Sequence, residues 1–322
     1  MMRNEFVEYD SKRLKGTPIL LGNGFSIGVN ERFDYRTILS EISKKSSSKL
    51  EKYIQEIETE NIEEILHGLN SEKGLNKVLG FDNKELIEIE YELKELFCNV
   101  ILDYSVPLSH LDYKTGVRDE LDMFGSIYTT NYDLSVYYLI SLIGFEKYSD
   151  GFNKSYDGKL YFDRNHIVDG RKTLLYLHGC LHIYQSGEQV YKVKSRSKKD
   201  YLKKILQRKF KSKEFPHIIS EGGSEYKLDK ISQSPYLSFV LESLREDSSS
   251  DLFIYGYSLH EYDEHIIDVI KSNFETIHYT YYYENKNIEE EYKRLKNILP
   301  DTSIFIYSHK DVFNGLNRRL EY

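Results

Sequence analysis

The stretch PILLGNGFS at residues 18–26 sets a short apolar run directly before a turn that contains two glycines. A run that is apolar at every position is typical of a strand buried on both faces of a parallel sheet. Gly22 and Gly24 would let the backbone approach a phosphate group, and the following amides and the Ser26 hydroxyl could donate to its oxygens. The motif is not a true GxGxxG, because Gly28 falls one residue too late, so a plain tight turn stays open.

Five further apolar runs predict strands, at 126–130, 173–177, 251–256, 274–283 and 302–307. Helical patterns fall between them, and the clearest covers 83–102, where apolar residues form one stripe. Other helices are expected at 34–42, 61–69, 133–142, 235–244, 261–271 and 287–299. Strands that alternate with helices predict an α/β fold, a Rossmann-like mostly parallel sheet with helices on both faces.

We expect the whole chain, residues 1–322, to form a single domain with two insertions. The helical stretch from about 34 to 108 is longer than one crossover between strands requires, so it predicts a helical insertion packed against the sheet. Residues 144–171 read as loops with a small hairpin. A polar, basic insertion is expected at about 185–234, with one amphipathic helix near 200–210.

Charge and hydropathy narrow the classes of function. The formal net charge of −8 does not favour nucleic acid as a partner. The first residues lack the apolar core of a signal peptide, and no apolar run reaches the roughly 18 residues that span a bilayer. We therefore expect a cytoplasmic protein without a membrane segment.

The sequence contains two cysteines, Cys98 and Cys180. These are too few for a disulfide framework or for a zinc site made of several cysteines.

The run 192–213 departs from the acidic balance, with eleven Lys or Arg residues and the single acid Asp200. A solvated helix face is the interpretation that we favour for it. A surface that steers an acidic partner, or one that contacts nucleic acid, is the alternative.

Polar residues follow the second and third expected strands at their carboxyl ends, where ligands bind in parallel sheets. The string TTNYD at 129–133 brings Asn131, which could hold a ribose hydroxyl or a water, and Asp133, which could accept from an amide or a ribose. Capping of the next helix by Asp133 is the structural alternative. His178 in the string YLHG is placed as a general base, with His182 as a competing candidate.

The string IYGYSL at 254–259 forms another strand end, where Gly256 permits close backbone approach and Ser258 could contact ribose or phosphate. His260 and His265 follow with acids between them. Their spacing is not the i, i+4 of a helical zinc pair, and a third ligand is not evident, so we expect no metal.

Taken in order, these four strings resemble the signature of the sirtuin family, and more closely the sirtuin-like NAD-consuming proteins of bacterial antiphage defence. The resemblance implies a sirtuin-like domain that takes NAD as its substrate. Asn131 would position the attacking water, Asp133 would lie near the carboxamide and His178 would act as the base on the ribose side. The residues implied to bind NAD are Gly22, Asn23, Gly24, Phe25, Ser26, Thr130, Gly256 and Ser258.

The chain departs from protein-deacylating sirtuins, which carry four zinc-binding cysteines between the His-Gly and Gly-x-Ser strings. Only Cys180 lies in that interval here, so we do not expect deacylation. The sequence predicts an NAD glycohydrolase that releases nicotinamide and ADP-ribose as a regulated effector of antiphage defence. A non-catalytic sensor of NAD or an ADP-ribose derivative is the alternative. An activating partner protein or self-association is expected, because unrestrained NAD cleavage would kill the host cell.

Overall fold

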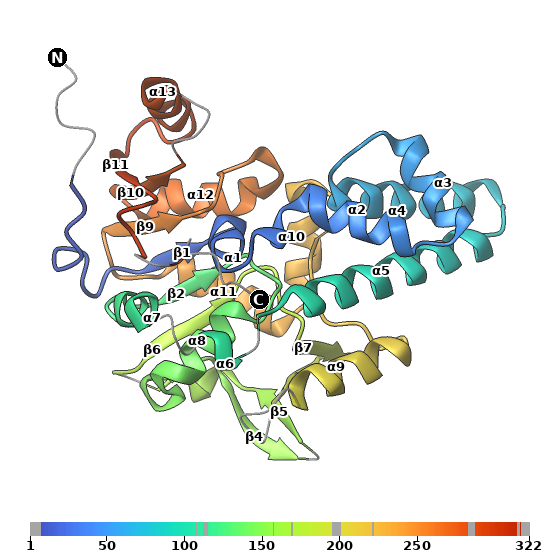
Figure 1. Ribbon diagram of the computed structural model, residues 1–322, viewed down its shortest axis with the longest axis horizontal. Helices are drawn as coiled ribbons and strands as arrows, with labels where there is room; N and C mark the ends of the chain where they lie inside the picture. Colours follow the sequence, from blue (N-terminus) through green and yellow to red (C-terminus); the bar gives the residue numbers. More distant parts are fainter. Residues whose placement is uncertain are drawn as a thin grey trace.

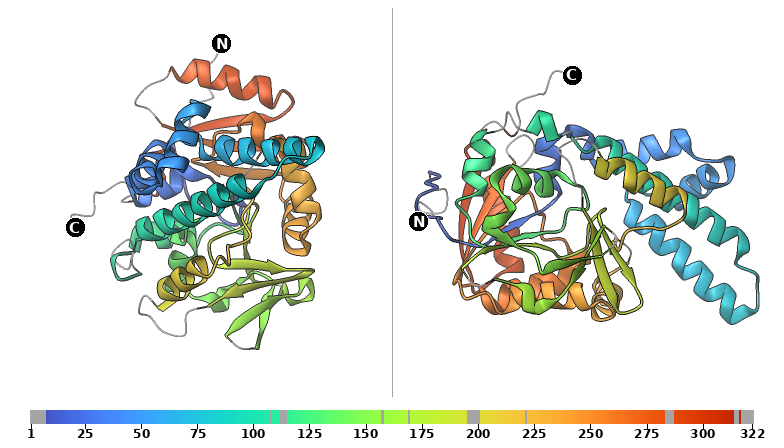
Figure 2. Two further views of the ribbon diagram at one scale, coloured as in Figure 1. Left: turned by 90° about the vertical axis from the view of Figure 1, so that its right-hand side faces the viewer. Right: turned by 90° about the horizontal axis from the view of Figure 1, so that it is seen from below.

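The computed structural model describes residues 8–106, 108–111, 115–156, 158–168, 170–194, 201–220, 222–282, 287–313 and 316. A seven-stranded sheet forms its centre, with helices on both faces and a group of helices that extends to one side (Figures 1 and 2). The predicted α/β class is confirmed.

The central sheet has the strand order β11-β10-β9-β1-β2-β6-β3, and its neighbouring strands are all parallel. The strands are β1 Ile19–Leu21, β2 Ile127–Thr129, β3 Tyr148–Ser149, β6 Lys172–Tyr176, β9 Asp251–Tyr255, β10 Thr276–Tyr281 and β11 Ser303–Ser308. From β1 the chain moves outward through β2 to β6, then returns to β9 on the other side of β1. Without the short β3, this is the 3-2-1-4-5-6 order of a Rossmann sheet, with its switch point between β1 and β9.

Apolar residues fill both faces of the inner strands, so helices must cover both. The helices α10 Ser224–Ser232, α11 Pro235–Arg245 and α12 Glu264–Asn273 pack together. The remaining helices near the sheet are α1 Asn23–Val29, α6 Leu108–Leu111, α7 Thr115–Leu121, α8 Ser135–Ile143 and α13 Ile288–Ile298. Short 3-10 turns lie at η1 Glu31–Phe33, η2 Phe145–Lys147, η3 Arg164–His166 and η4 Glu261–Asp263.

Four helices lie between α1 and α6, in the stretch for which the sequence predicts a helical insertion: α2 Tyr35–Lys45, α3 Ser48–Ile57, α4 Ile62–Leu79 and α5 Lys84–Tyr104. They extend away from the sheet on the right of Figure 1. The long helix α5 buries the expected stripe, including Leu93 and Phe97, against its neighbours. Within the described residues, no helix has the length and apolar character needed to cross a membrane.

A second, antiparallel sheet was only partly foreseen. Its strands β4 Phe152–Tyr156, β5 Lys159–Phe162, β7 Ile183–Ser186 and β8 Gln189–Val193 run in the order β4-β5-β8-β7. The sequence predicted a hairpin within 144–171, but not that two strands of the basic insertion join it. The amphipathic helix is α9 Tyr201–Lys211, which buries Leu202, Leu206 and Phe210. Residues 195–200 of the basic run lie outside the described residues.

Candidate functional site

A pocket of about 200 Å³ lies at the carboxyl edge of the central sheet, beside the switch point. Residues that follow β1, β2, β6 and β9 form its floor, and the helical insertion lies over it through Tyr35, Ile38, Glu63 and Ile101. The volume is below the roughly 300–1,000 Å³ of typical ligand pockets. The pocket is lined by Asn23, Phe33, Tyr35, Ile38, Glu63, Ile101, Thr130, Asn131, Tyr132, Asp133, His178, Gly256, Tyr257, Ser258 and Asp263.

Asn131 and His178 reach this pocket from neighbouring strands. Thr129 of β2 pairs with Tyr176 of β6, and Asn131 and His178 each lie two residues after this pair. The Asn131 amide Nδ2 donates to the Gly22 carbonyl at 2.9 Å, which ties the β2 end to the turn after β1. The sheet register therefore brings together two of the three residues that the sequence named as catalytic, Asn131 and His178.

Asp133 lies in the pocket wall, but both of its carboxylate oxygens are engaged by the protein. The Ser26 hydroxyl donates to Oδ2, and the Ser135 backbone amide donates to Oδ1 at 2.7 Å. Ser26 is fully buried and does not line the pocket. Asp133 therefore accepts from the first residue of α8, close to the structural alternative of a helix cap, although the N-cap position itself is Leu134. Its bond from Ser26 also joins α1 to the end of β2.

The glycine turn serves backbone packing across the switch point. A Cβ added to Gly24 would lie 2.6 Å from the Gly256 Cα, and one added to Gly22 would lie 2.5 Å from the Gly256 oxygen. The Gly24 amide donates to the Gly256 carbonyl at 2.8 Å, and the Gly22 amide donates to the Tyr255 carbonyl at 2.9 Å. The two glycines therefore permit close approach of the turn after β9, at the place where the sequence predicted the approach of a phosphate.

We expect Gly24→Ala to lower the free energy of unfolding by about 1–3 kcal/mol, since the new methyl group overpacks against the backbone of Gly256. Gly74→Ala is the matched control. A Cβ at Gly74 meets no atom within 4 Å, so alanine inside α4 should stabilise by roughly 0.5–1 kcal/mol. Urea denaturation measures both variants, and equal stability of Gly24→Ala and the parent would contradict the packing described.

The other residues implied to bind NAD divide into two groups. Phe25 is buried in the core against Tyr255 and Phe313 and does not line the pocket. The pocket-lining group is Asn23, Thr130, Gly256 and Ser258, of which Ser258 is exposed.

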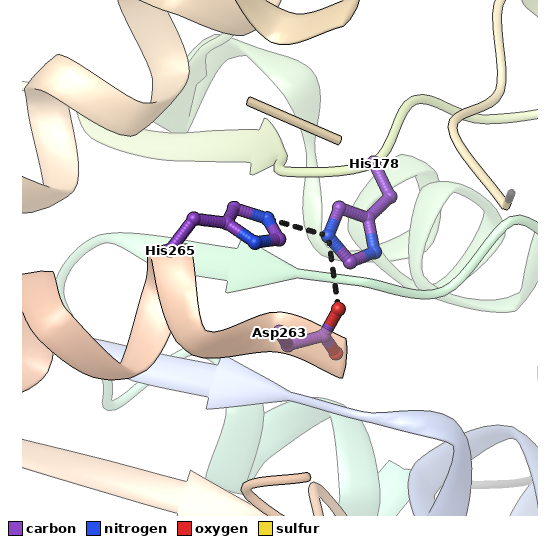
Figure 3. A group of neighbouring side chains, drawn as sticks. All are labelled: His178, Asp263 and His265. Carbon is purple, nitrogen blue, oxygen red and sulfur yellow. Dashed lines mark hydrogen bonds and ion pairs between the residues drawn. The ribbon is translucent and has the colours of Figure 1, made fainter. Parts of the chain in front are cut away.

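His178 meets Asp263 and His265 at the inner side of the pocket (Figure 3). Its Nε2 lies 3.2 Å from the Nε2 of His265 and 3.6 Å from Oδ1 of Asp263. His182, the competing candidate, is buried beside the Cys180 sulfur at 3.1 Å and does not line the pocket. His260 is exposed at the start of η4, so the sequence pair of His260 and His265 does not form a site.

A buried lysine completes the group of charges around His178. Lys227 of α10 donates to Oδ1 of Asp263 at 2.8 Å and to Oε2 of Glu63 at 3.2 Å, and its side chain is 1% exposed. The hydroxyls of Tyr257 and Tyr132 donate to the same two carboxylates, each at 3.0 Å. Each buried charge therefore has an opposite charge and a further hydrogen bond, as burial of ions requires.

Burial and these charges shift the pKa values of the group in opposite directions. Burial lowers the pKa of His178 to about 3 and that of His265 to about 4. Burial would raise the pKa of Asp263, but His178 and Lys227 outweigh it and hold that pKa at about 2. Burial raises the pKa of Glu63 against the opposing charge of Lys227. At neutral pH both imidazoles are thus neutral and Asp263 is ionised.

Two neutral imidazoles and a carboxylate are a donor set that divalent transition metals use. One ligand atom each of His178, Asp263 and His265 lies within 4.8 Å of the others. However, the Lys227 ammonium already donates to Oδ1 of Asp263, the oxygen that faces His178. A second cation would lie beside this ammonium, so the charges of the site fit Lys227 better than a metal.

We expect the free energy of unfolding to fall as pH drops from about 6.5 to 4. In this range His178 and His265 bind protons in the unfolded chain but stay neutral in the folded protein, because their pKa values are lowered there. Each histidine contributes a slope of at most about 1.4 kcal/mol per pH unit. Glu63 has the opposite sign, since its raised pKa favours proton uptake by the folded state. Urea denaturation at pH 7 and pH 5 should show a shallower fall in His265→Leu than in the parent, and equal slopes would contradict this account.

Sequence reasoning missed Lys227 and Glu63 and gave no role to Asp263 or His265. Asp263 had a signal, because it lies five residues after Ser258 of the IYGYSL string that carried part of the family resemblance. Lys227 and Glu63 had none, since each lies in a helix and their partners are far away in the sequence.

Comparison with known proteins gives a family and a weak structural likeness. The family described as "Domain of unknown function (DUF4917)" matches residues 19–311. No curated protein matches the sequence. A solved structure described as "The Structural basis of Sirtuin Substrate Affinity" aligns over 96% of this chain and 94% of that chain, with 13% identity and a TM-score of 0.41. A second, "Structural Basis for the Mechanism and Regulation of Sir2 Enzymes", aligns over 95% and 92%, with 11% identity and a TM-score of 0.36. Both likenesses are weak, so any assignment of activity has to rest on the chain's own site.

Proposed function

This chain belongs to the DUF4917 family, and we propose that it is an NAD glycohydrolase. One observation carries the proposal: Asn131 and His178 line one pocket at the carboxyl edge of a Rossmann-ordered sheet, beside its switch point. That edge is where sheets of this order bind nucleotides. The proposed role as an effector of antiphage defence rests on the sequence resemblance alone.

The reaction suits a site that orients the substrate and stabilises charge without supplying a general acid. The bond between the ribose C1′ and the nicotinamide nitrogen breaks, and both electrons remain on the nitrogen. Nicotinamide is cationic while bound and leaves neutral, so its departure needs no general acid. The ribose becomes oxocarbenium-like, and water adds to C1′ and loses one proton. The protein therefore has to orient the ribose, stabilise positive charge and deliver the water.

We assign these tasks to side chains of the pocket. Asn131 holds the water or a ribose hydroxyl, and His178, neutral at pH 7, accepts the proton. Asn23, Thr130 and Ser258 contact the rest of the dinucleotide. Asp133 was expected near the carboxamide, but its hydrogen bonds to Ser26 and Ser135 give it a supporting role instead. No metal takes part in this scheme.

The helical insertion gives the proposal a means of control. Tyr35, Ile38 and Ile101 of this insertion line the pocket, whose volume of about 200 Å³ is too small for a whole dinucleotide. We propose that an activating partner protein or self-association shifts the insertion and opens the pocket. Switching about a hundredfold needs roughly 2.7 kcal/mol of differential affinity for the two states.

Nicotinamide release by dilute protein, by concentrated or cross-linked protein, and by protein mixed with the product of a neighbouring gene tests this control. We expect the rate per molecule to rise with concentration or with the added protein. Full activity of dilute monomer, unchanged by any addition, would end the idea of gating.

The basic run offers a second contact surface for such a partner. In its described part, Lys192, Lys203 and Lys209 pair with Asp150, Asp103 and Glu214. Lys204, Arg208 and Lys211 are exposed on the outer face of α9. These exposed charges of α9 form a solvated helix face, which an acidic partner would contact.

Binding of ADP-ribose tests the site without turnover. At about one hundred times its dissociation constant, ADP-ribose should raise the free energy of unfolding by roughly 2.7 kcal/mol. The variant Ser258→Trp, which fills the exposed rim of the pocket, should abolish this stabilisation. Glu290→Trp on the exposed face of α13 is the matched control and should keep it. Equal stabilisation of both variants would place the ligand elsewhere.

A further inference from the structure

Two buried imidazoles face one another at the pocket wall. His178 follows β6 and His265 is the second residue of α12, and their Nε2 atoms are 3.2 Å apart. Their side chains lie at 2% and 4% exposure, and Figure 3 shows the two rings meeting edge to edge above Asp263. A contact at this distance is a hydrogen bond only if one of the two nitrogens carries a proton and the other does not.

The charge state of the pair restricts the possible arrangements. Both imidazoles are neutral at pH 7, so each carries one N–H and one lone pair. The tautomers of the two rings are therefore coupled. Either His178 donates from Nε2 and keeps its Nδ1 free, or His265 donates and the Nδ1 of His178 carries the proton.

The surroundings favour donation by His178. Its Nε2 also faces Oδ1 of Asp263 at 3.6 Å, and a lone pair on this nitrogen would point at an ionised carboxylate. An N–H there points at negative charge instead. The groups that face the His178 ring are Asp263 of η4, Lys227 of α10 and His265 of α12.

The far side of His265 is compatible with the same assignment, since the Ser224 hydroxyl can either donate to or accept from the Nδ1 of that ring. Ser224 Oγ accepts from the His265 backbone amide at 2.7 Å and lies 3.2 Å from the Nδ1 of that ring. A hydroxyl oxygen has two lone pairs, so it can also accept from an Nδ1–H of His265. With its proton on Nδ1, His265 offers an unprotonated Nε2 to His178.

We propose that His265 is a positioning residue that fixes the tautomer of His178. By accepting from Nε2–H, it leaves Nδ1 of His178 as the unprotonated nitrogen that takes a proton from water or a ribose hydroxyl in the pocket. This inference rests on the proposed function for its consequence, because it names the atom that acts as the base.

Three variants test the consequence for catalysis. His265→Leu removes the acceptor, and kcat for NAD cleavage should fall about tenfold or more with KM changed less than twofold. His265→Gln restores an acceptor and should recover most of kcat. His278→Leu is the control, since His278 of β10 is buried between Tyr307 and Asp251 and does not line the pocket. It should lower stability without changing kcat. Equal losses of kcat in His265→Leu and His265→Gln, or none in either, would overturn the proposal.

Nitrogen-15 NMR of the histidine rings tests the hydrogen bond independently of activity. The His178 ring, assigned through a His178→Gln variant, should show the neutral Nε2–H tautomer in the parent and in His265→Gln. His265→Leu should show a mixture of tautomers. An Nδ1–H tautomer in the parent, or a stoichiometric metal ion in the purified protein lost in His265→Leu, would overturn the inference. A parent with the Nε2–H tautomer and no NAD cleavage would instead contradict the proposed function.

Discussion

The Asn131→Ala variant is expected to cleave NAD about 10²–10³-fold more slowly than the parent, because it loses the amide that holds the water or the ribose at C1′. The same amide donates to the Gly22 carbonyl at 2.9 Å inside the fold. Its removal takes one of two hydrogen bonds from that buried oxygen, which also accepts from the Phe25 amide at 2.9 Å, so stability should also fall by about 0.5–1.5 kcal/mol. Turnover has to be measured well below the melting temperature of the variant.

The Tyr128→Phe variant separates a loss of rate that comes from the chemistry from one that comes from lower stability. The Tyr128 hydroxyl lies on the same strand and donates to the Ser243 carbonyl at 2.9 Å, but the residue does not line the pocket. This variant should lose a similar buried hydrogen bond and keep its rate within about twofold. If Asn131→Ala and Tyr128→Phe slow NAD cleavage equally, Asn131 acts only through stability and its assigned role is wrong.

The largest effect on stability is expected from Lys227→Met. Its removal leaves Glu63 and Asp263 as two buried carboxylates without their cation, which typically costs about 3–5 kcal/mol. The charge of Asp263 beside His178 would then be unbalanced as well. Urea denaturation at pH 7 measures the loss.

Two comparisons make the Lys227 prediction specific. Lys204→Met removes an exposed lysine of α9 and should change stability by less than about 0.5 kcal/mol. The double variant Lys227→Met with Glu63→Gln removes one of the two unpaired charges and should recover part of the loss. A single Lys227→Met variant as stable as Lys204→Met would show that the buried ion pairs are absent in solution.

The sheet was predictable because its strands are buried on both faces. Runs such as Ile19–Leu21 and Asp251–Tyr255 are apolar at nearly every position. This pattern can be recognised in the sequence without knowing which strands lie beside them. The antiparallel sheet was largely missed because its strands mix tyrosine with lysine and glutamine, as in Gln189–Val193, and they are buried by packing that is not local.

Some residues of the candidate site could likewise be predicted from the sequence, and others could not. Asn131 and His178 were identified because a residue at the carboxyl end of a parallel strand has a known position relative to the sheet. The sequence predicted that the glycine turn contacts a phosphate. The packing of Gly24 against Gly256 could not be predicted, because these residues are far apart in the sequence. Lys227 reaches Glu63 across 164 residues, and no local pattern marks a helix position for such a role.

Release of nicotinamide from NAD by the purified protein is the most direct test of the central claim. The parent and Asn131→Ala should be incubated with NAD over a wide range of protein concentration, alone and cross-linked, and the products identified by mass spectrometry. We expect nicotinamide and ADP-ribose in equal amounts from the parent, and at least about a hundredfold less from Asn131→Ala. Intact NAD under every condition, or equal release by both proteins, would contradict the assignment of this pocket as an NAD glycohydrolase site.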